Sequence, residues 1–126
     1  MAINSKRKGS RGENELAELL RKYGYKDARR SAQYCGKNGG VADVVGVDGL
    51  HIECKRAERV LEENFLQQAE HDARKGQVPV VMYRRNGEEW KALLRLNIFM
   101  AIWDELTEKQ KATIKDKVTL IRRVDK

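Results

Sequence analysis

The sequence of 126 residues has few of the features that mark zinc-binding, membrane or secreted proteins. Its two cysteines, Cys35 and Cys54, form no CxxC pair and its two histidines are separated, so no zinc-ligand spacing is present. No apolar run approaches the roughly 18 residues of a membrane-spanning helix. The first residues, MAINSKRKGS, lack the apolar core of a signal peptide. These absences predict a cytoplasmic protein in which Cys54 is a buried thiol.

The length predicts a single domain at residues 1–126 with a core of modest size. A hydrophobic content of 40% is typical of soluble globular proteins. Within this domain we expect a basic N-terminal arm at residues 1–9 and a C-terminal helical segment from about residue 97 to residue 126. The sequence indicates no role for that last segment.

The charge balance points to a polyanionic partner. Lysine and arginine number 26 against 19 aspartates and glutamates, which gives a net charge of +7 at pH 7. Such side chains bind phosphates by releasing condensed counterions, so nucleic acid is the simplest candidate. For each basic cluster taken alone, a solvated surface without a ligand is the alternative. The clusters at the start of the chain and at the first loop contain Lys6, Arg7, Lys8, Arg11, Arg29 and Arg30.

The spacing of apolar residues predicts an α/β fold with a central mixed β-sheet flanked by helices. We expect helices at about 11–23, 61–75 and 97–105, with a further helix starting near Thr107. Strands are expected at about 25–31, 41–47, 50–56, 80–83 and 90–96.

The segment from Val41 to Arg56, VADVVGVDGLHIECKR, carries the most informative pattern. Alternate residues of a strand share a face, so Glu53 and Lys55 should point the same way while the residues between them point into the core. A hairpin closed by Asp48-Gly49, a favoured turn dipeptide, would bring Asp43 near Glu53. Two carboxylates would then lie beside one lysine.

Oxygen ligands of this kind suit a hard divalent cation such as Mg²⁺ or Mn²⁺, which keeps waters for an incoming phosphate. A solvated strand edge or a cross-strand salt bridge is the alternative interpretation. A second Glu-x-Lys occurs at Glu89-Trp90-Lys91, but the apolar strand before it holds no aspartate. Only the first copy therefore has a complete set of groups.

A glycine-bearing loop, QYCGKNGG at residues 33–40, leads into the strand of Asp43. Glycines there permit close approach of a ligand, so we expect this loop, with Lys37, to touch the substrate. A connector with no further role is the alternative. Gln67 and Gln68 on the second predicted helix could donate at the edge of the site, although ordinary exposed glutamines explain them more simply.

Glu13 has two competing interpretations. Ser10-x-x-Glu13 fits a capping box, in which the glutamate returns to the amide of the N-cap residue and needs no catalytic explanation. A glutamate in the first turn of a helix that packs on the sheet could instead supply a further carboxylate to the metal site. One rotamer cannot fill both roles.

The segments KGSRGENEL, RRSAQ, ADVVGV and HIECKR, in this order and spacing, resemble the archaeal-type Holliday junction resolvases and their phage-encoded relatives in the PD-(D/E)xK nuclease superfamily. The likeness covers about Lys6 to Leu96. It implies a restriction-endonuclease-like fold, a homodimer, Mg²⁺ dependence and symmetric cleavage of four-way DNA junctions. By position it assigns a helix glutamate to Glu13, which favours the metal-site interpretation over capping.

The same resemblance places a metal-binding aspartate at Asp43, a second metal carboxylate at Glu53 and the catalytic lysine at Lys55. It also implies substrate contacts at Arg30 and Ser31. We therefore expect Asp43, Glu53 and the Cys54 carbonyl to bind the metal. The chain departs from the family's pattern at Asn14, where arginine is frequent, and its segment after Leu96 matches nothing in the pattern.

The expected function is thus metal-dependent hydrolysis of DNA at four-way junctions. The closest alternative is a related nuclease that nicks flaps, mismatches or single strands, because one catalytic face can serve many substrates. A noncatalytic DNA-binding module is a further alternative. Against it, Asp43 and Glu53 beside a phosphate-binding surface would repel DNA unless a cation intervened.

Overall fold

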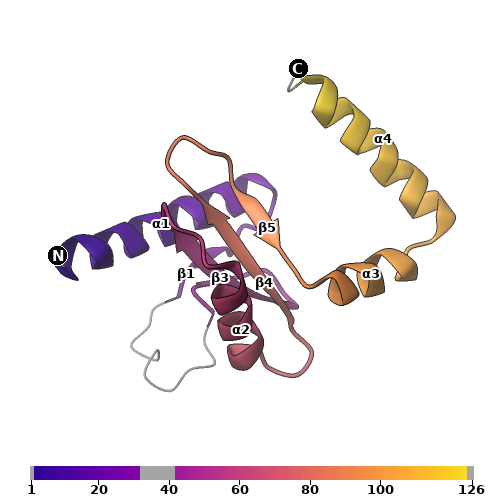
Figure 1. Ribbon diagram of the computed structural model, residues 1–126. Helices are drawn as coiled ribbons and strands as arrows, with labels where there is room; N and C mark the ends of the chain where they lie inside the picture. The colour runs from indigo at the N-terminus through magenta and orange to yellow at the C-terminus, as the bar shows by residue number, and fades with distance from the viewer. Residues whose placement is uncertain (1, 32–41, 125–126) are drawn as a thin grey trace. The chain divides into compact units, whose positions relative to one another are not determined.

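The computed structural model describes residues 2–31 and 42–124, and the side chains of residues 9–31 and 42–123 (Figure 1). The predicted glycine-bearing loop, with Lys37 and Cys35, lies outside these residues. The chain divides into two compact units, Met1–Leu94 and Arg95–Lys126. Each unit is described by itself, and the single domain expected from the length stays a prediction.

The first unit is a five-stranded mixed sheet with a helix on each face. Its elements in chain order are α1 (Ala2–Lys22), β1 (Arg29–Arg30), β2 (Val44–Val45), β3 (Leu50–Arg56), α2 (Glu62–Asp72), β4 (Val78–Arg84) and β5 (Lys91–Leu93). The strands lie in the order β1-β2-β3-β4-β5, antiparallel except for the parallel pair β3 and β4. A parallel pair needs a crossover, which α2 supplies. The α/β fold with a mixed sheet is confirmed.

The face of the sheet that packs on α1 is apolar. Leu16 and Leu20 of α1 pack on Ile52 and Cys54 of β3 and on Val80 of β4, and all five are at most 8% exposed. The side chains of β3 between these residues point to the opposite face.

Helix α2 covers that opposite face (Figure 1). Leu66 and Ala69 pack on Val81 of β4, and Phe65 and Tyr83 extend the cluster. Helices therefore bury the middle of the sheet on both sides. His51 and Glu53 of β3 lie beneath α2 and are buried.

Helix α1 begins nine residues earlier than predicted, at Ala2 instead of Arg11. Ser10 consequently lies inside the helix, where it cannot be an N-cap, so the alternative interpretation of Ser10 and Glu13 as a capping box is wrong. No proline occurs in this segment to end the helix, and its glycines cost only about 1 kcal/mol each relative to alanine. Gly12 lies against Arg56, where a Cβ would be 2.8 Å from the Arg56 Cβ. The basic arm of residues 2–9 is therefore the first part of a helix.

The predicted hairpin around Asp48-Gly49 is confirmed, with Val44 opposite Ile52. Gly46 has φ 101°, and a Cβ at this position would overlap the Asp27 carbonyl oxygen. Only glycine fits this close approach without strain. The strand β2 is shorter than predicted, at two residues, because the chain turns at Gly46.

The second unit consists of α3 (Leu96–Glu105) and α4 (Glu108–Val124). Thr107 and Gln110 form a capping box, in which the Gln110 amide donates to Thr107 Oγ1 at 3.1 Å and the Thr107 amide donates to Gln110 Oε1 at 2.8 Å. This confirms the helix predicted to start near Thr107. An apolar groove between the two helices is lined by residues that include Phe99, Trp103 and Ile114. No helix in the described part of the chain is long and apolar enough to cross a membrane.

Candidate metal and nuclease site

The candidate site is built on one face of β3, where His51, Glu53 and Lys55 alternate with the apolar residues of the other face. The predicted common direction of Glu53 and Lys55 follows from this pleat. The prediction did not foresee that Glu53 would be only 1% exposed. Because β3 is a central strand, its neighbours and α2 close around the carboxylate.

Asp43 directly precedes β2, and the hairpin brings it beside Glu53. The Asp43 amide donates to the Ile52 carbonyl at 2.9 Å, and Asp43 Oδ2 accepts from the Cys54 amide at 2.8 Å. Burial raises the pKa of Asp43 to about 7, and the charge of Glu53 acts in the same direction, followed by that of Glu13. The bond from the Cys54 amide opposes these effects. Two carboxylates are thus held close together at low exposure.

Glu53 is fixed from one side by a histidine. Its Oε1 lies 2.8 Å from His51 Nε2, and both side chains are almost completely buried. The second oxygen, Glu53 Oε2, is buried and has no hydrogen-bond partner among the residues that the structure describes. An isolated buried carboxylate oxygen is unfavourable unless a proton or a cation meets it. Sequence reasoning assigned no role to His51, because only spacing between zinc ligands was considered.

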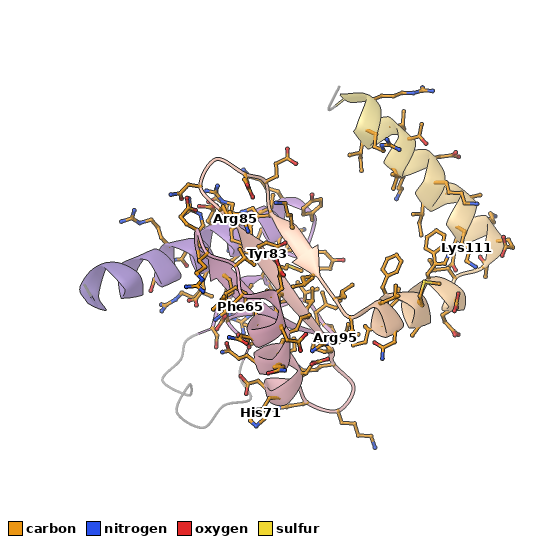
Figure 2. All side chains as sticks on the ribbon, viewed as in Figure 1. Phe65, His71, Tyr83, Arg85, Arg95 and Lys111 are labelled. Carbon is orange, nitrogen blue, oxygen red and sulfur yellow. The ribbon has the colours of Figure 1, made fainter. Side chains whose placement is uncertain are left out.

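Lys55 reaches toward α2. Its Nζ donates to Gln68 Oε1 at 3.2 Å and lies 5.2 Å from the centroid of the Phe65 ring. Figure 2 shows Phe65 on α2 near Tyr83 of β4, the residue that pairs with Lys55 in the sheet. Gln68 is an exposed residue, but it accepts this bond from Lys55. The simpler interpretation of Gln68 as an ordinary surface glutamine did not include this contact.

Glu13 lies at the edge of the site and binds Arg30. Its Oε1 accepts from Arg30 Nε at 2.7 Å, and the two side chains are 20% and 44% exposed. Glu13 is also among the charges that raise the pKa of Asp43. The structure thus places Glu13 within electrostatic reach of Asp43, with a cationic partner from β1.

The other residues predicted to contact DNA differ in their exposure. Arg11 and Arg29 are exposed, and the Arg29 guanidinium donates to the Asp27 carbonyl at 2.9 Å. Ser31 is only 8% exposed, and its amide donates to the Asp43 carbonyl at 2.9 Å. The side chains of Lys6, Arg7 and Lys8 are outside the described part of the structure.

The donor atoms fit a hard divalent cation. Asp43 and Glu53 offer carboxylate oxygens, and Glu53 Oε2 is a buried acceptor that a cation would satisfy. A second grouping, formed by His51, Glu53 and Asp72, has one ligand-type atom from each residue within 4.8 Å of the others. Both groupings share Glu53, which makes this carboxylate the centre of the candidate site.

The comparison with protein families gives the context for this geometry. Residues 4–126 match the model of the family described as "Phage putative PDDEXK endonuclease". The chain belongs to this family. Its members are nucleases of PD-(D/E)xK type, which typically use a divalent metal, and the match extends through both units. A search of curated proteins finds no match.

Membership of the PDDEXK endonuclease family confirms the nuclease part of the sequence prediction. The family description does not specify a junction substrate, a dimer or Mg²⁺ in particular. The roles of the individual residues also stay predictions.

Proposed function

We propose that this chain is a Mg²⁺-dependent endodeoxyribonuclease that cuts four-way DNA junctions symmetrically as a homodimer. The observation that carries the hydrolytic part is a carboxylate pair, buried Glu53 and half-buried Asp43, on the same sheet face as Lys55. Junction cleavage rests on the resemblance of the segments around Glu13 and Arg30 to junction resolvases. A C2 dimer would hold two such sites at the fixed separation that paired cuts require.

In this proposal Asp43, Glu53 and the Cys54 carbonyl hold the cation, and Glu13 shapes the edge of the site. The cation would polarise the phosphate and lower the pKa of an attacking water. The Asp43 carboxylate is oriented by the Cys54 amide, so its other oxygen has a defined direction. Lys55 supplies positive charge beside the scissile phosphate, either to orient the water or to neutralise charge in the transition state.

The phosphate backbone of the DNA is bound by basic groups around the site. The proposed set is Lys6, Arg7, Lys8, Arg11, Arg29, Arg30, Ser31 and Lys37. Arg30 also neutralises Glu13, which reduces the repulsion that this carboxylate would exert on a phosphate. We further propose that the protein acts inside the cell, where its DNA substrate is.

The test is cleavage of a labelled immobile four-way junction beside a duplex and a flap of matched sequence, with Mg²⁺ or with EDTA. Paired symmetric cuts in the junction alone are expected, and these should disappear with EDTA. Cutting of the flap or duplex instead would keep the nuclease and refute the junction specificity. Tight binding without metal-dependent cutting would leave a noncatalytic DNA-binding protein.

The second Glu-x-Lys of the chain provides a matched control. Lys55→Ala should abolish turnover and leave DNA binding intact, because other basic residues supply the phosphate contacts. Lys91→Ala removes the same side chain at the equivalent position of the second copy, where Lys91 pairs with Glu88 on the surface. Lys91→Ala should therefore cut normally. A fully active Lys55→Ala protein would refute the proposed site.

A further inference from the structure

His51 is a polar residue in a position that an apolar side chain could fill. It lies in the central strand β3 and is 0% exposed. Its Nδ1 atom is buried and has no hydrogen-bond partner in the described part of the chain. An unpaired buried polar atom costs roughly 1–3 kcal/mol, so packing alone would favour valine or isoleucine here. The imidazole therefore needs another explanation.

The contact that His51 does make is with Glu53. Ionised Glu53 can only accept hydrogen bonds, so the 2.8 Å contact requires the hydrogen to be on His51 Nε2. This bond occupies Oε1 and fixes the rotamer of the carboxylate, since both groups are buried. Oε2, the oxygen without a described partner, is then the one left for a cation shared with Asp43.

We propose that His51 is a positioning residue, whose Nε2–H group holds Glu53 so that its second oxygen is directed to the divalent cation. This inference rests on the proposed function, because it assumes that Glu53 is a metal ligand. At 2.8 Å with a hydrogen between the two atoms, the His51 Nε2 contact leaves no room for a cation between them. The arrangement matches the general rule that groups behind the ligands orient them and set metal affinity.

Asp72 at the end of α2 lies near the same pair, since a ligand-type atom of each of the three residues lies within 4.8 Å of the others. Asp72 also contacts His71, whose Nδ1 is 3.1 Å from Asp72 Oδ1. Figure 2 shows His71 at the end of α2, and its side chain is 87% exposed. His71 therefore offers a control of the same residue type beside the same cluster.

The experiment compares four variants: His51→Gln, His51→Asn, His51→Leu and, as the control, His71→Leu. The glutamine amide can reach the place of the imidazole Nε2, whereas the shorter asparagine amide reaches only the place of Nδ1. Binding of Mn²⁺ to the full chain without DNA is measured by calorimetry and by the loss of the free Mn²⁺ electron paramagnetic resonance signal. Circular dichroism melts establish that each variant is folded.

We expect His51→Gln to bind Mn²⁺ within a few-fold of wild type, and His51→Asn and His51→Leu to bind about 10–100-fold more weakly. His71→Leu should bind as wild type does. Equal losses in His51→Gln and His51→Asn would show that only the imidazole shape matters and would overturn the inference. Wild-type affinity in folded His51→Leu or His51→Asn would also overturn it.

The two proposals fail differently. Active wild-type enzyme together with unchanged metal affinity in His51→Asn would refute only the role of His51. A wild-type protein that neither binds Mn²⁺ nor cuts DNA would refute the nuclease proposal and, with it, the inference about Glu53 and His51.

Discussion

The two faces of β3 are both buried but are built on different physical grounds. On the α1 side, Ile52 and Cys54 join a continuous apolar cluster. On the α2 side, Glu53 is just as buried yet places a carboxylate beside Asp43, whose pKa rises to about 7. A carboxylate buried beside a second carboxylate opposes folding, whereas the apolar face favours it. This difference indicates that the α1 face of β3 stabilises the sheet, whereas the α2 face of β3 holds polar groups that oppose folding.

The largest effect is expected for Glu53→Gln, which changes the α2 face of β3. The change keeps the shape of the side chain but removes a charge, so cleavage should fall by about 100-fold or more, the scale of losing one preorganised polar contact at a reacting centre. Without added metal, the melting temperature should stay the same or rise, because the carboxylate that raises the Asp43 pKa is gone. Cleavage assays and calorimetric melts measure the two effects.

Glu89→Gln is the matched control, since Glu89 occupies the same place in the second Glu-x-Lys and is exposed. It should alter neither activity nor melting. A large loss of stability in Glu53→Gln would contradict the comparison, because it would make the polar face a stabilising one.

Gln68→Ala tests the contact that holds Lys55 under α2. Removing the acceptor of the 3.2 Å bond frees Lys55 Nζ, and turnover should fall by about 10-fold, because small displacements of a reacting group cost up to about 100-fold. Single-turnover cleavage at saturating protein measures this loss. Gln67→Ala is the neighbouring control, since Gln67 bonds to Glu63 on the same helix. Equal activity of the two variants would remove Gln68 from the site.

Ile52→Val tests the apolar face next to Glu53. Loss of one buried methylene should lower the free energy of unfolding by about 0.5–1.5 kcal/mol, because Ile52 is 0% exposed. Cleavage by the folded protein should stay near the wild-type rate. Urea unfolding followed by circular dichroism gives the stability, and the junction assay gives the rate. A clear fall in the cleavage rate of the folded Ile52→Val protein would mean that the two faces are coupled.

The sequence predicted the parts of the fold that local patterns determine. Alternation in LHIECKR placed β3 at its observed bounds, and Asp48-Gly49 placed the turn. A local pattern was misleading at Ser10, which has the chemistry of an N-cap but lies inside α1. Propensity at one residue cannot show that the preceding turn is already helical.

The candidate site was predicted in its residue types but not in its environment. Spacing alone placed Asp43 near Glu53, but the burial of Glu53 depends on the tertiary packing of α2 on the sheet. His51 was missed for a different reason, because its spacing was compared only with that of zinc ligands. A histidine two residues before the glutamate shares its strand face, and this periodicity is the signal that could have identified it.

The smallest effect is expected for a substitution of Glu15. This residue of α1 is a partly exposed carboxylate and contrasts with buried Glu53. It accepts from Arg84 Nε at 2.5 Å and from Trp90 Nε1 at 3.1 Å, and its side chain is 39% exposed. The hydrogen bond from Arg84 is the main reason that the pKa of Glu15 lies below its ordinary value of 4.5. A lowered pKa means that the folded state favours the charged form.

Glu15→Gln should therefore lower the free energy of unfolding at neutral pH by less than about 1 kcal/mol, because the pair is partly exposed and screened by solvent. The wild-type advantage is present above the pKa of Glu15 in the unfolded chain and is lost as the pH falls through its lower pKa in the folded protein. Urea unfolding of both proteins across this acidic range measures the difference. A stability gap that persists below the folded pKa would show that Glu15 acts by packing instead of by charge, and the contrast with buried Glu53 would then lose its electrostatic basis.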